Sequence, residues 1–105
     1  MKFYSTILLL GLSIIAYTQN SLRGTITDEN NIPLFGVEIY APKLHKGVTS
    51  IEDGTYKFNN LPNGSVDIVF AFMGYQSVVK TVMFDGSEKE LNIILEESVF
   101  EMDEI

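Results

Sequence analysis

The chain of 105 residues contains no cysteine, no tryptophan and a single histidine. Without cysteine it forms no disulfide, no thiolate metal site and no lipid anchor of the lipobox type. His45 lies beside Lys46 in a segment that we expect to be a loop, and one histidine cannot complete a nucleophilic triad or a common zinc site. A lone loop histidine is usually a solvated side chain. The sequence therefore predicts no catalytic, cofactor-binding or metal-binding residues.

Basic residues are also scarce, with 7 Lys and Arg against 14 Asp and Glu and a formal net charge of −7. A surface that follows nucleic-acid phosphates needs the opposite balance, so nucleic acid is not an expected partner. Acidic residues gather at the C-terminus, where charge alone predicts a solvated tail. They are Glu96, Glu97, Glu101, Asp103 and Glu104.

Long apolar runs are absent except near the N-terminus, where Ile7 to Ala16 follows Lys2. This run is shorter than the roughly 18 residues of a membrane-spanning helix, and the small residues Ala16 and Thr18 lie near its end, as before a signal-peptidase cut. We therefore expect a helical signal peptide at residues 1–18, cut just before Gln19. An exported domain without disulfides suits a bacterial envelope. A buried strand or a short membrane anchor is the alternative interpretation.

After residue 20, turn residues recur at about ten-residue spacing between short alternating segments. Asp53 with Gly54 predicts one turn and Pro62 with Gly64 another, because glycine reaches positive φ and proline presets φ near about −65°. The pattern predicts an all-β fold, a small antiparallel Greek-key sandwich of about seven strands. The expected strands are residues 21–28, 36–40, 47–51, 55–58, 65–73, 76–84 and 90–95.

The same pattern predicts two local details. Residues 47–51 and 55–58 are expected to form a hairpin over Glu52, Asp53 and Gly54, since that turn is tight. Glu52 and Asp53 could also suggest a calcium site, but such sites need a longer series of acidic residues. Tyr75, directly after Gly74, is expected to be a corner residue whose hydroxyl donates to the backbone at a strand crossing.

The expected core consists of the apolar residues that alternate toward one face of these segments. They are Leu22, Ile26, Val37, Ile39, Tyr56, Phe58, Leu61, Ile68, Phe70, Phe72, Leu91, Ile93 and Leu95.

The order of these parts resembles a carboxypeptidase regulatory-like domain, which implies a transthyretin-like β-sandwich. The resemblance runs from Leu22 to Leu95, and we expect the domain at residues 21–96 with an acidic linker at 97–105. The matching residues are Gly24 to Asp28, Pro33 to Val37, Ile39, Tyr40, Gly47, Asp53, Gly54, Tyr56, Phe58, Leu61, Pro62, Gly64, Phe72, Gly74, Tyr75, Leu91 to Ile93 and Leu95.

The tail resembles the exit of this domain in SusC/RagA-type TonB-dependent outer-membrane receptors. In that family an acidic linker leads to an extended segment, the TonB box, and then to a plug and a barrel. The residues Met102, Asp103, Glu104 and Ile105 resemble the start of the box. The resemblance implies a TonB-type partner that pairs with this segment by strand addition, and a location at the periplasmic face of the outer membrane.

Three classes of function remain open from the sequence. In the first class, the chain is the N-terminal accessory domain of such a receptor and acts as a non-catalytic spacer or docking module. Alternatively, it is a free-standing exported binding or interaction domain of the cell envelope. The third class, an enzyme or its accessory domain, has the least support because the histidines of a transthyretin-like hydrolase are missing. A self-crosslinking adhesin repeat is disfavoured too, since Arg23 stands where that chemistry requires a lysine.

Overall fold

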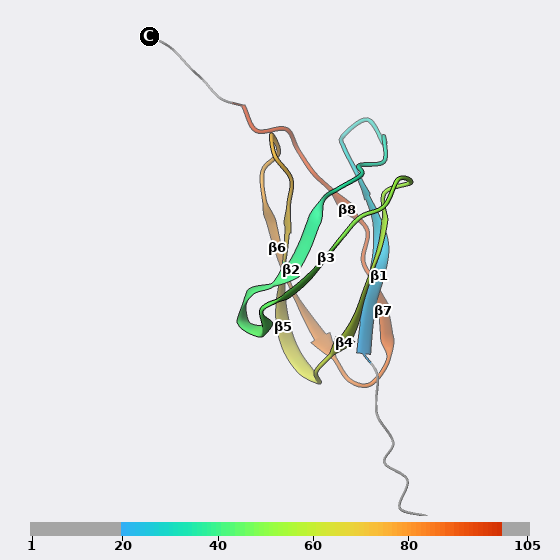
Figure 1. The fold of residues 1–105 in the computed structure, drawn as a ribbon, viewed down its shortest axis with the longest axis vertical. Coiled ribbons are helices and arrows are strands. Elements are labelled where there is room, and N and C mark those ends of the chain that lie inside the picture. The colour runs from blue at the N-terminus through green and yellow to red at the C-terminus, as the bar shows by residue number, and fades with distance from the viewer. Residues whose placement is uncertain (1–19, 100–105) are drawn as a thin grey trace, which may run out of the picture.

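The computed structural model describes residues 20–99, so the expected signal peptide at residues 1–18 lies outside the described range. Two four-stranded sheets face each other across one core (Figure 1). One sheet contains β1 (Asn20–Thr27), β4 (Thr55–Leu61), β7 (Glu88–Glu90) and β8 (Ile93–Ile94). The other contains β2 (Glu38–Ala41), β3 (Lys46–Thr49), β5 (Gly64–Ala71) and β6 (Val78–Phe84), with a 3₁₀ turn at Pro42–Leu44 between β2 and β3. The predicted all-β sandwich is confirmed.

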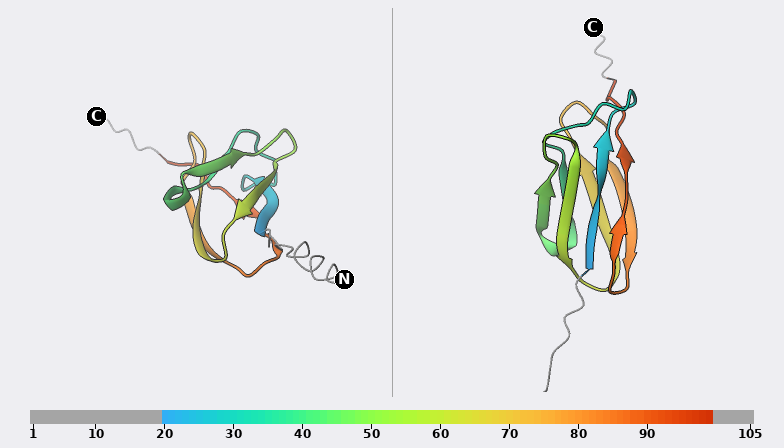
Figure 2. Two further views of the ribbon diagram at one scale, coloured as in Figure 1. Left: turned by 60° about the horizontal axis from the view of Figure 1, so that its bottom comes forward. Right: turned by 90° about the vertical axis from the view of Figure 1, so that its right-hand side faces the viewer.

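The last expected strand, residues 90–95, is divided into β7 and β8. Both run parallel to β1, whereas the other strand pairs are antiparallel (Figure 2). Between them the Oδ1 atom of Asn92 accepts the Thr25 N–H at 2.9 Å. A side chain thus replaces a backbone acceptor at this point, and the described residues form eight strands where about seven were expected.

The hairpin predicted from residues 47–51 and 55–58 is wrong. The tight turn is present, since the Gly54 N–H donates to the Ile51 carbonyl at 2.8 Å. However, β3 pairs with β2 and β4 pairs with β1, so the turn carries the chain from one sheet to the other. Ser50 explains the crossing. It is buried, and its hydroxyl donates to the Leu34 carbonyl at 2.7 Å and accepts the Val37 N–H at 2.9 Å, which holds the chain to the β2 side up to this residue.

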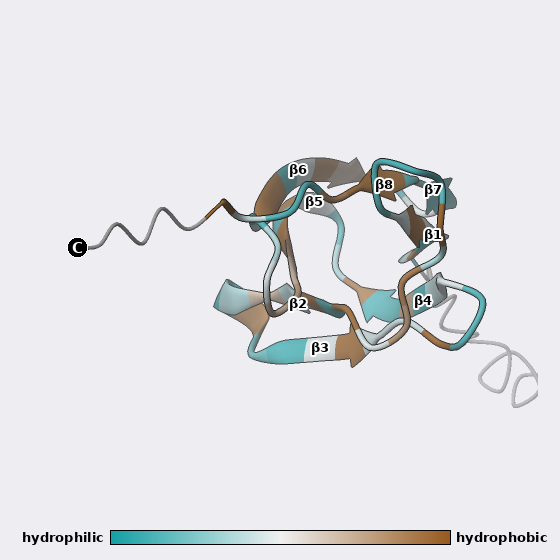
Figure 3. Cartoon of the chain, turned by 90° about the horizontal axis from the view of Figure 1, so that it is seen from above, coloured by the Kyte–Doolittle hydropathy of each residue, from teal (hydrophilic) through white to brown (hydrophobic). Residues whose placement is uncertain are grey.

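The core lies between the two sheets, which are seen from above in Figure 3. It agrees closely with the expected set. Every expected core residue is buried except Phe72 and Leu91, which are partly buried and pack against the core. The structure adds four residues to it, namely Leu34, Ala41, Val66 and Phe84. Tyr56 and Phe70 meet across the core edge to face, with ring centroids 5.7 Å apart, an arrangement that aromatic quadrupoles favour.

Candidate functional site

The described chain enters and leaves the sandwich at opposite ends (Figure 1). At the entry, Asn20 donates from Nδ2 to Oδ1 of Asn63, just before β5 begins, at 2.9 Å. At the exit, the Ser98 N–H donates to the carbonyl of Gly74, after β5 has ended, at 2.8 Å. The two ends are therefore separated by the length of β5, whose 8 residues span roughly 26 Å at about 3.3 Å each.

The exit segment, which we define as Glu96 to Ser98, is attached to the turn after β5 by backbone groups. The Gln76 N–H donates to the Glu96 carbonyl at 2.8 Å, and Tyr75 and Glu97 form an antiparallel bridge. Leu95, just before this segment, donates its N–H to the Thr27 carbonyl of β1 at 2.9 Å. The chain thus crosses from the first sheet to the second before it leaves the sandwich. The predicted TonB-contacting residues, Met102 to Ile105, lie outside the described residues.

Tyr75 does not make the predicted corner hydrogen bond. Its ring packs on Phe72, with centroids 5.5 Å apart, and among residues 20–99 its hydroxyl has no hydrogen-bond partner. Gly74, at φ 89°, turns the chain so that Tyr75 lies half-buried at the end of the sandwich. The corner hydrogen bond is made by Tyr56 instead, whose hydroxyl donates to the Leu91 carbonyl at 2.7 Å.

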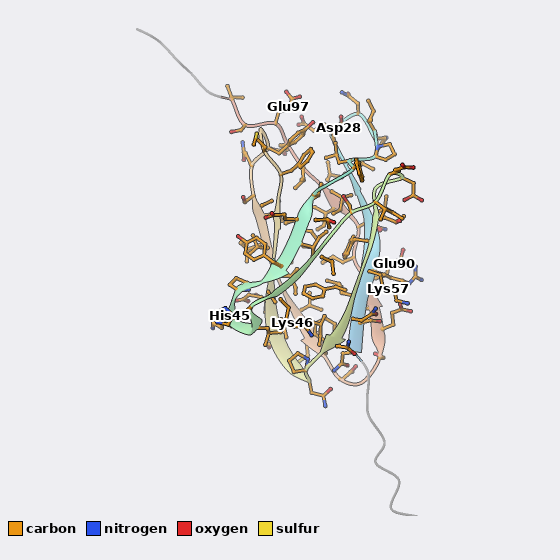
Figure 4. All side chains as sticks on the ribbon, in the orientation of Figure 1. Asp28, His45, Lys46, Lys57, Glu90 and Glu97 are labelled. Atoms are coloured by element: carbon orange, nitrogen blue, oxygen red, sulfur yellow. The ribbon has the colours of Figure 1, made fainter. Side chains whose placement is uncertain are left out.

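Acidic groups surround Tyr75 at the exit end. Partial burial, followed by the carboxylates of Glu97, Asp28 and Glu29, raises the pKa of the Tyr75 hydroxyl. Asp28 and Glu97 lie at the same end of the molecule (Figure 4). Asp28 itself is engaged, because its Oδ1 accepts the N–H groups of Asn30 at 2.8 Å and Ile32 at 3.0 Å. The exit end is thus a negatively charged surface around the half-buried Tyr75.

The remaining predicted turn residues lie in the loops that link the two sheets or, for Gly64, at the first position of the strand that follows. The Asp53 carboxylate accepts the Thr55 hydroxyl at 2.7 Å and the Thr55 N–H at 3.1 Å, and these bonds lower its pKa. Gly54 and Gly64 have φ of 82° and 105°, and Pro62 is exposed directly after β4. Asp53 and Gly54 thus precede β4, and Pro62 and Gly64 follow it. In the described part of the chain, the two turns do not line a common pocket.

The described residues offer little for catalysis or metal binding. His45 is exposed and ends the 3₁₀ turn with φ 55°, and the neighbouring Lys46 donates to the Asn60 carbonyl at 2.7 Å (Figure 4). Within residues 20–99 no three His, Asp or Glu side chains come together as a metal-binding group. No helix in the same range is long and apolar enough to cross a membrane.

The outer faces of the two sheets differ in character. On the first sheet, Arg23 lies 3.5 Å from the Glu88 carboxylate and 3.7 Å from that of Glu90, and Lys57 lies 3.6 Å from Glu88. This outer face is therefore covered by exposed, mutually compensated charges.

The outer face of the second sheet carries apolar side chains in register. Tyr40 of β2 pairs with Val69 of β5, which pairs with Val79 of β6. Beside Tyr40 is a recess of about 470 Å³, which we call the Tyr40 recess. It is lined by Glu38, Tyr40, Gly47, Val48 and Thr49.

The Tyr40 recess was not predicted from the sequence. The available signal is Gly47, a glycine inside a strand, which often marks a close approach of another group. A Cβ at this position would lie 2.9 Å from the Cβ of Tyr40 and 3.2 Å from the Ile39 carbonyl oxygen, so a side chain does not fit here. Gly47 meets Tyr40 because β2 pairs with β3 in a register that places these two residues opposite each other.

Several solved structures share this fold. A type II cohesin–X-dockerin complex from Acetivibrio cellulolyticus aligns with a TM-score of 0.62 and 12% identity, over 72% of this chain and 56% of that one. The 3-chlorocatechol 1,2-dioxygenase of Rhodococcus opacus aligns with a TM-score of 0.60 and 10% identity, over 79% and 61% of the two chains. The Bacillus anthracis TIE protein gives a TM-score of 0.60 and 24% identity, over 76% and 17%.

This chain spans less than two thirds of each of these three chains, and at such identities the similarity shows the fold alone. A comparison with curated proteins found no significant match. The model of the CarboxypepD_reg-like domain family matches residues 22–105, which is most of the sequence and all of the described sandwich beyond its first two residues. The chain therefore belongs to the CarboxypepD_reg-like domain family.

Proposed function

We propose that this domain is the N-terminal periplasmic accessory module of a TonB-dependent outer-membrane receptor for nutrient uptake, in which it acts as a non-catalytic spacer or docking element. The observation that carries the proposal is the way in which the chain passes through the sandwich. It enters beside Asn63 and leaves beside Gly74, so the module adds roughly the length of β5 between the segments attached to its two ends.

The exit geometry supports a role in presenting the tail. Backbone hydrogen bonds at Glu96 and Ser98 fix where the chain leaves, and these bonds do not depend on side chains. Beyond them the sequence continues as a mixture of acidic and apolar residues up to Ile105. Like charges repel one another, which favours an extended segment, and an extended segment pairs readily with the sheet edge of a partner. Transport itself is assigned to the plug and barrel of the receptor.

The first test measures binding of the full exported chain, purified from the periplasm, to the periplasmic domain of a TonB protein by isothermal titration calorimetry. We expect binding to weaken at least about tenfold when Phe100 to Ile105 are deleted, because in strand addition the backbone of the added segment supplies the affinity and its alternate side chains supply the specificity. The matched control scrambles the same six residues, which keeps composition and charge but changes the order of the side chains. A loss in both variants supports sequence-specific strand addition. Binding that survives the deletion contradicts the placement of the contact.

The second test reads the gene beyond the codon for Ile105. We expect a short β-prone apolar run followed by a plug-like sequence. A stop codon at that point would contradict the receptor role and favour the alternative, a free-standing exported domain that binds another component of the cell envelope.

A further inference from the structure

The Tyr40 recess has the composition of a small ligand site. It lies on the outer surface of β2 and β3, where Tyr40 opposes Gly47 and Glu38 opposes Thr49 in the antiparallel register. Gly47 brings no side chain to the recess, and its backbone approaches Tyr40 so closely that a Cβ there would lie 2.9 Å from the Tyr40 Cβ. Tyr40 is 36% exposed although it lies within a strand.

The polar groups around the recess are uncommitted. Among residues 20–99 the Glu38 carboxylate takes part in no hydrogen bond or ion pair. Other carboxylates of the sandwich surface are engaged: Asp67 accepts the Thr81 hydroxyl at 2.6 Å, and Glu88 lies near Arg23 and Lys57. The Thr49 hydroxyl also makes no hydrogen bond within residues 20–99, so both groups are available to a ligand that lies against Tyr40.

We propose that the Tyr40 recess binds a neutral pyranose unit of a glycan. A pyranose has an apolar face of C–H groups, which fits an aromatic ring, and a rim of hydroxyl donors, which fits a carboxylate and a hydroxyl on one side of that ring. Each of these groups has a counterpart in the recess. The proposal does not depend on the receptor role and would hold equally for a free-standing domain.

The charge of the surface selects among sugars. Glu38 lines the recess, Asp67 lies on the same outer face, and the chain as a whole carries a formal net charge of −7. Anionic sugars such as uronic acids would be repelled and would leave the Glu38 carboxylate facing a like charge. Uncharged sugars donate hydrogen bonds to it without this cost.

The test follows the backbone amide signals of the isotope-labelled chain by NMR during titration with four oligosaccharides. Three are neutral (cellohexaose, xylohexaose and maltoheptaose), and the fourth, oligogalacturonate, is anionic. We expect at least one neutral sugar to shift the amides of Tyr40, Gly47 and Thr49 with an affinity near millimolar, and the anionic sugar to bind more weakly. Failure of all three neutral sugars at millimolar concentration, or equal binding of the anion, would overturn the proposal.

Substitutions inside and outside the Tyr40 recess test whether the sugar binds there or elsewhere on the outer face of the second sheet. Tyr40→Ala should weaken binding at least about tenfold, whereas Tyr40→Phe, which keeps the ring, should stay within about threefold. Glu38→Gln should weaken binding by about three- to tenfold, because a hydrogen bond to a charged acceptor is stronger than one to a neutral acceptor. Val79→Ala, on the same outer face but outside the recess, is the matched control and should bind as the wild type does. Undiminished binding by Tyr40→Ala would refute the assignment of the site.

Discussion

Asn20 ties three segments together at the entry end of the sandwich. It is 1% exposed; its Nδ2 atom donates to the Leu61 carbonyl and to Asn63, both at 2.9 Å, and its Oδ1 atom accepts the Gly86 N–H at 2.6 Å. Asn20→Ala leaves these groups without their partner in a buried place. We expect it to lower the free energy of unfolding by about 2–3 kcal/mol, measured by urea denaturation.

The matched control for that variant is Asn59→Ala. Asn59 is exposed on β4 at the same end of the sheet, and its truncation should change the unfolding free energy by less than about 0.5 kcal/mol. Equal effects of the two substitutions would show that the hydrogen bonds of Asn20 contribute little to stability.

Tyr56 makes stability depend on alkaline pH. Burial, followed by the Glu90 carboxylate, raises the pKa of its hydroxyl above that of a tyrosine in an unfolded chain, about 10. The contribution of the neutral Tyr56 hydroxyl to the free energy of unfolding is therefore complete below about pH 10. It is lost as the pH rises further, because Tyr56 ionises in the unfolded chain before it ionises in the folded protein. We expect the urea midpoint of the wild type to fall between pH 9 and about 11, and to fall less steeply in Tyr56→Phe. Identical slopes for the two proteins would contradict this assignment.

At the scale of single residues, the sequence alone predicted the buried positions but not the long-range contacts. The alternation of apolar residues was enough to predict the core, since inward and outward positions follow from a local period of two. A glycine inside a strand, such as Gly24 or Gly47, often marks a close approach, but the sequence does not say of which group. A Cβ at Gly24 would overlap the Leu91 carbonyl oxygen, 67 residues further along, and one at Gly47 would meet Tyr40. The Tyr40 recess depends on that second approach and so could not be predicted.

At the scale of elements, turns were predictable and strand pairing was not. The residues from Glu52 to Gly54 reverse the chain as expected, but a reversal of direction is compatible both with a hairpin and with a crossing between sheets. The choice is made by distant contacts: Ser50 is held at Leu34 and Val37, while the Gly54 carbonyl accepts the Ile26 N–H of β1 at 2.8 Å. None of these partners is visible in a local pattern.

The free edge of β6 yields a prediction about aggregation. Among the described strands this one, of 7 residues, pairs only with β5, and it contains no proline. Lys80 shares the inward side with Val78, Val82 and Phe84, and an inward charge on an edge strand discourages pairing with a second molecule. Lys80→Val would make the row of inward positions on this edge strand entirely apolar, so we expect faster growth of light scattering and thioflavin T fluorescence on gentle heating.

Lys43→Val provides the control for charge and size. Lys43 is exposed in the 3₁₀ turn, so its replacement removes the same charge without changing an edge strand. Aggregation at the wild-type rate by Lys80→Val, or equal acceleration by both variants, would show that the inward position of Lys80 is not protective.

At the scale of the whole molecule, the sandwich could be predicted because its strands and turns are distributed evenly along the sequence. The direction in which the chain leaves the sandwich could not, because it depends on contacts between β1, β8 and the turn after β5. Leu95 is held by Thr27 of β1, and Gln76 and Gly74 then hold Glu96 and Ser98. The last strand and the exit segment thus join the two sheets at one end of the molecule.

Gln76→Pro tests whether this closure is what fixes the exit. Proline has no N–H, so the variant loses the donor to the Glu96 carbonyl, while Gln76→Ala keeps it and changes only an exposed side chain. We expect hydrogen exchange at the Ser98 amide to accelerate at least about tenfold in the proline variant and to stay near the wild-type rate in the alanine variant, with the amides of β5 protected in both. Equal exchange at Ser98 in the two variants would mean that the exit segment is held by contacts other than this bond. In that case the fixed exit that supports the spacer role would have to depend on Leu95 and β8.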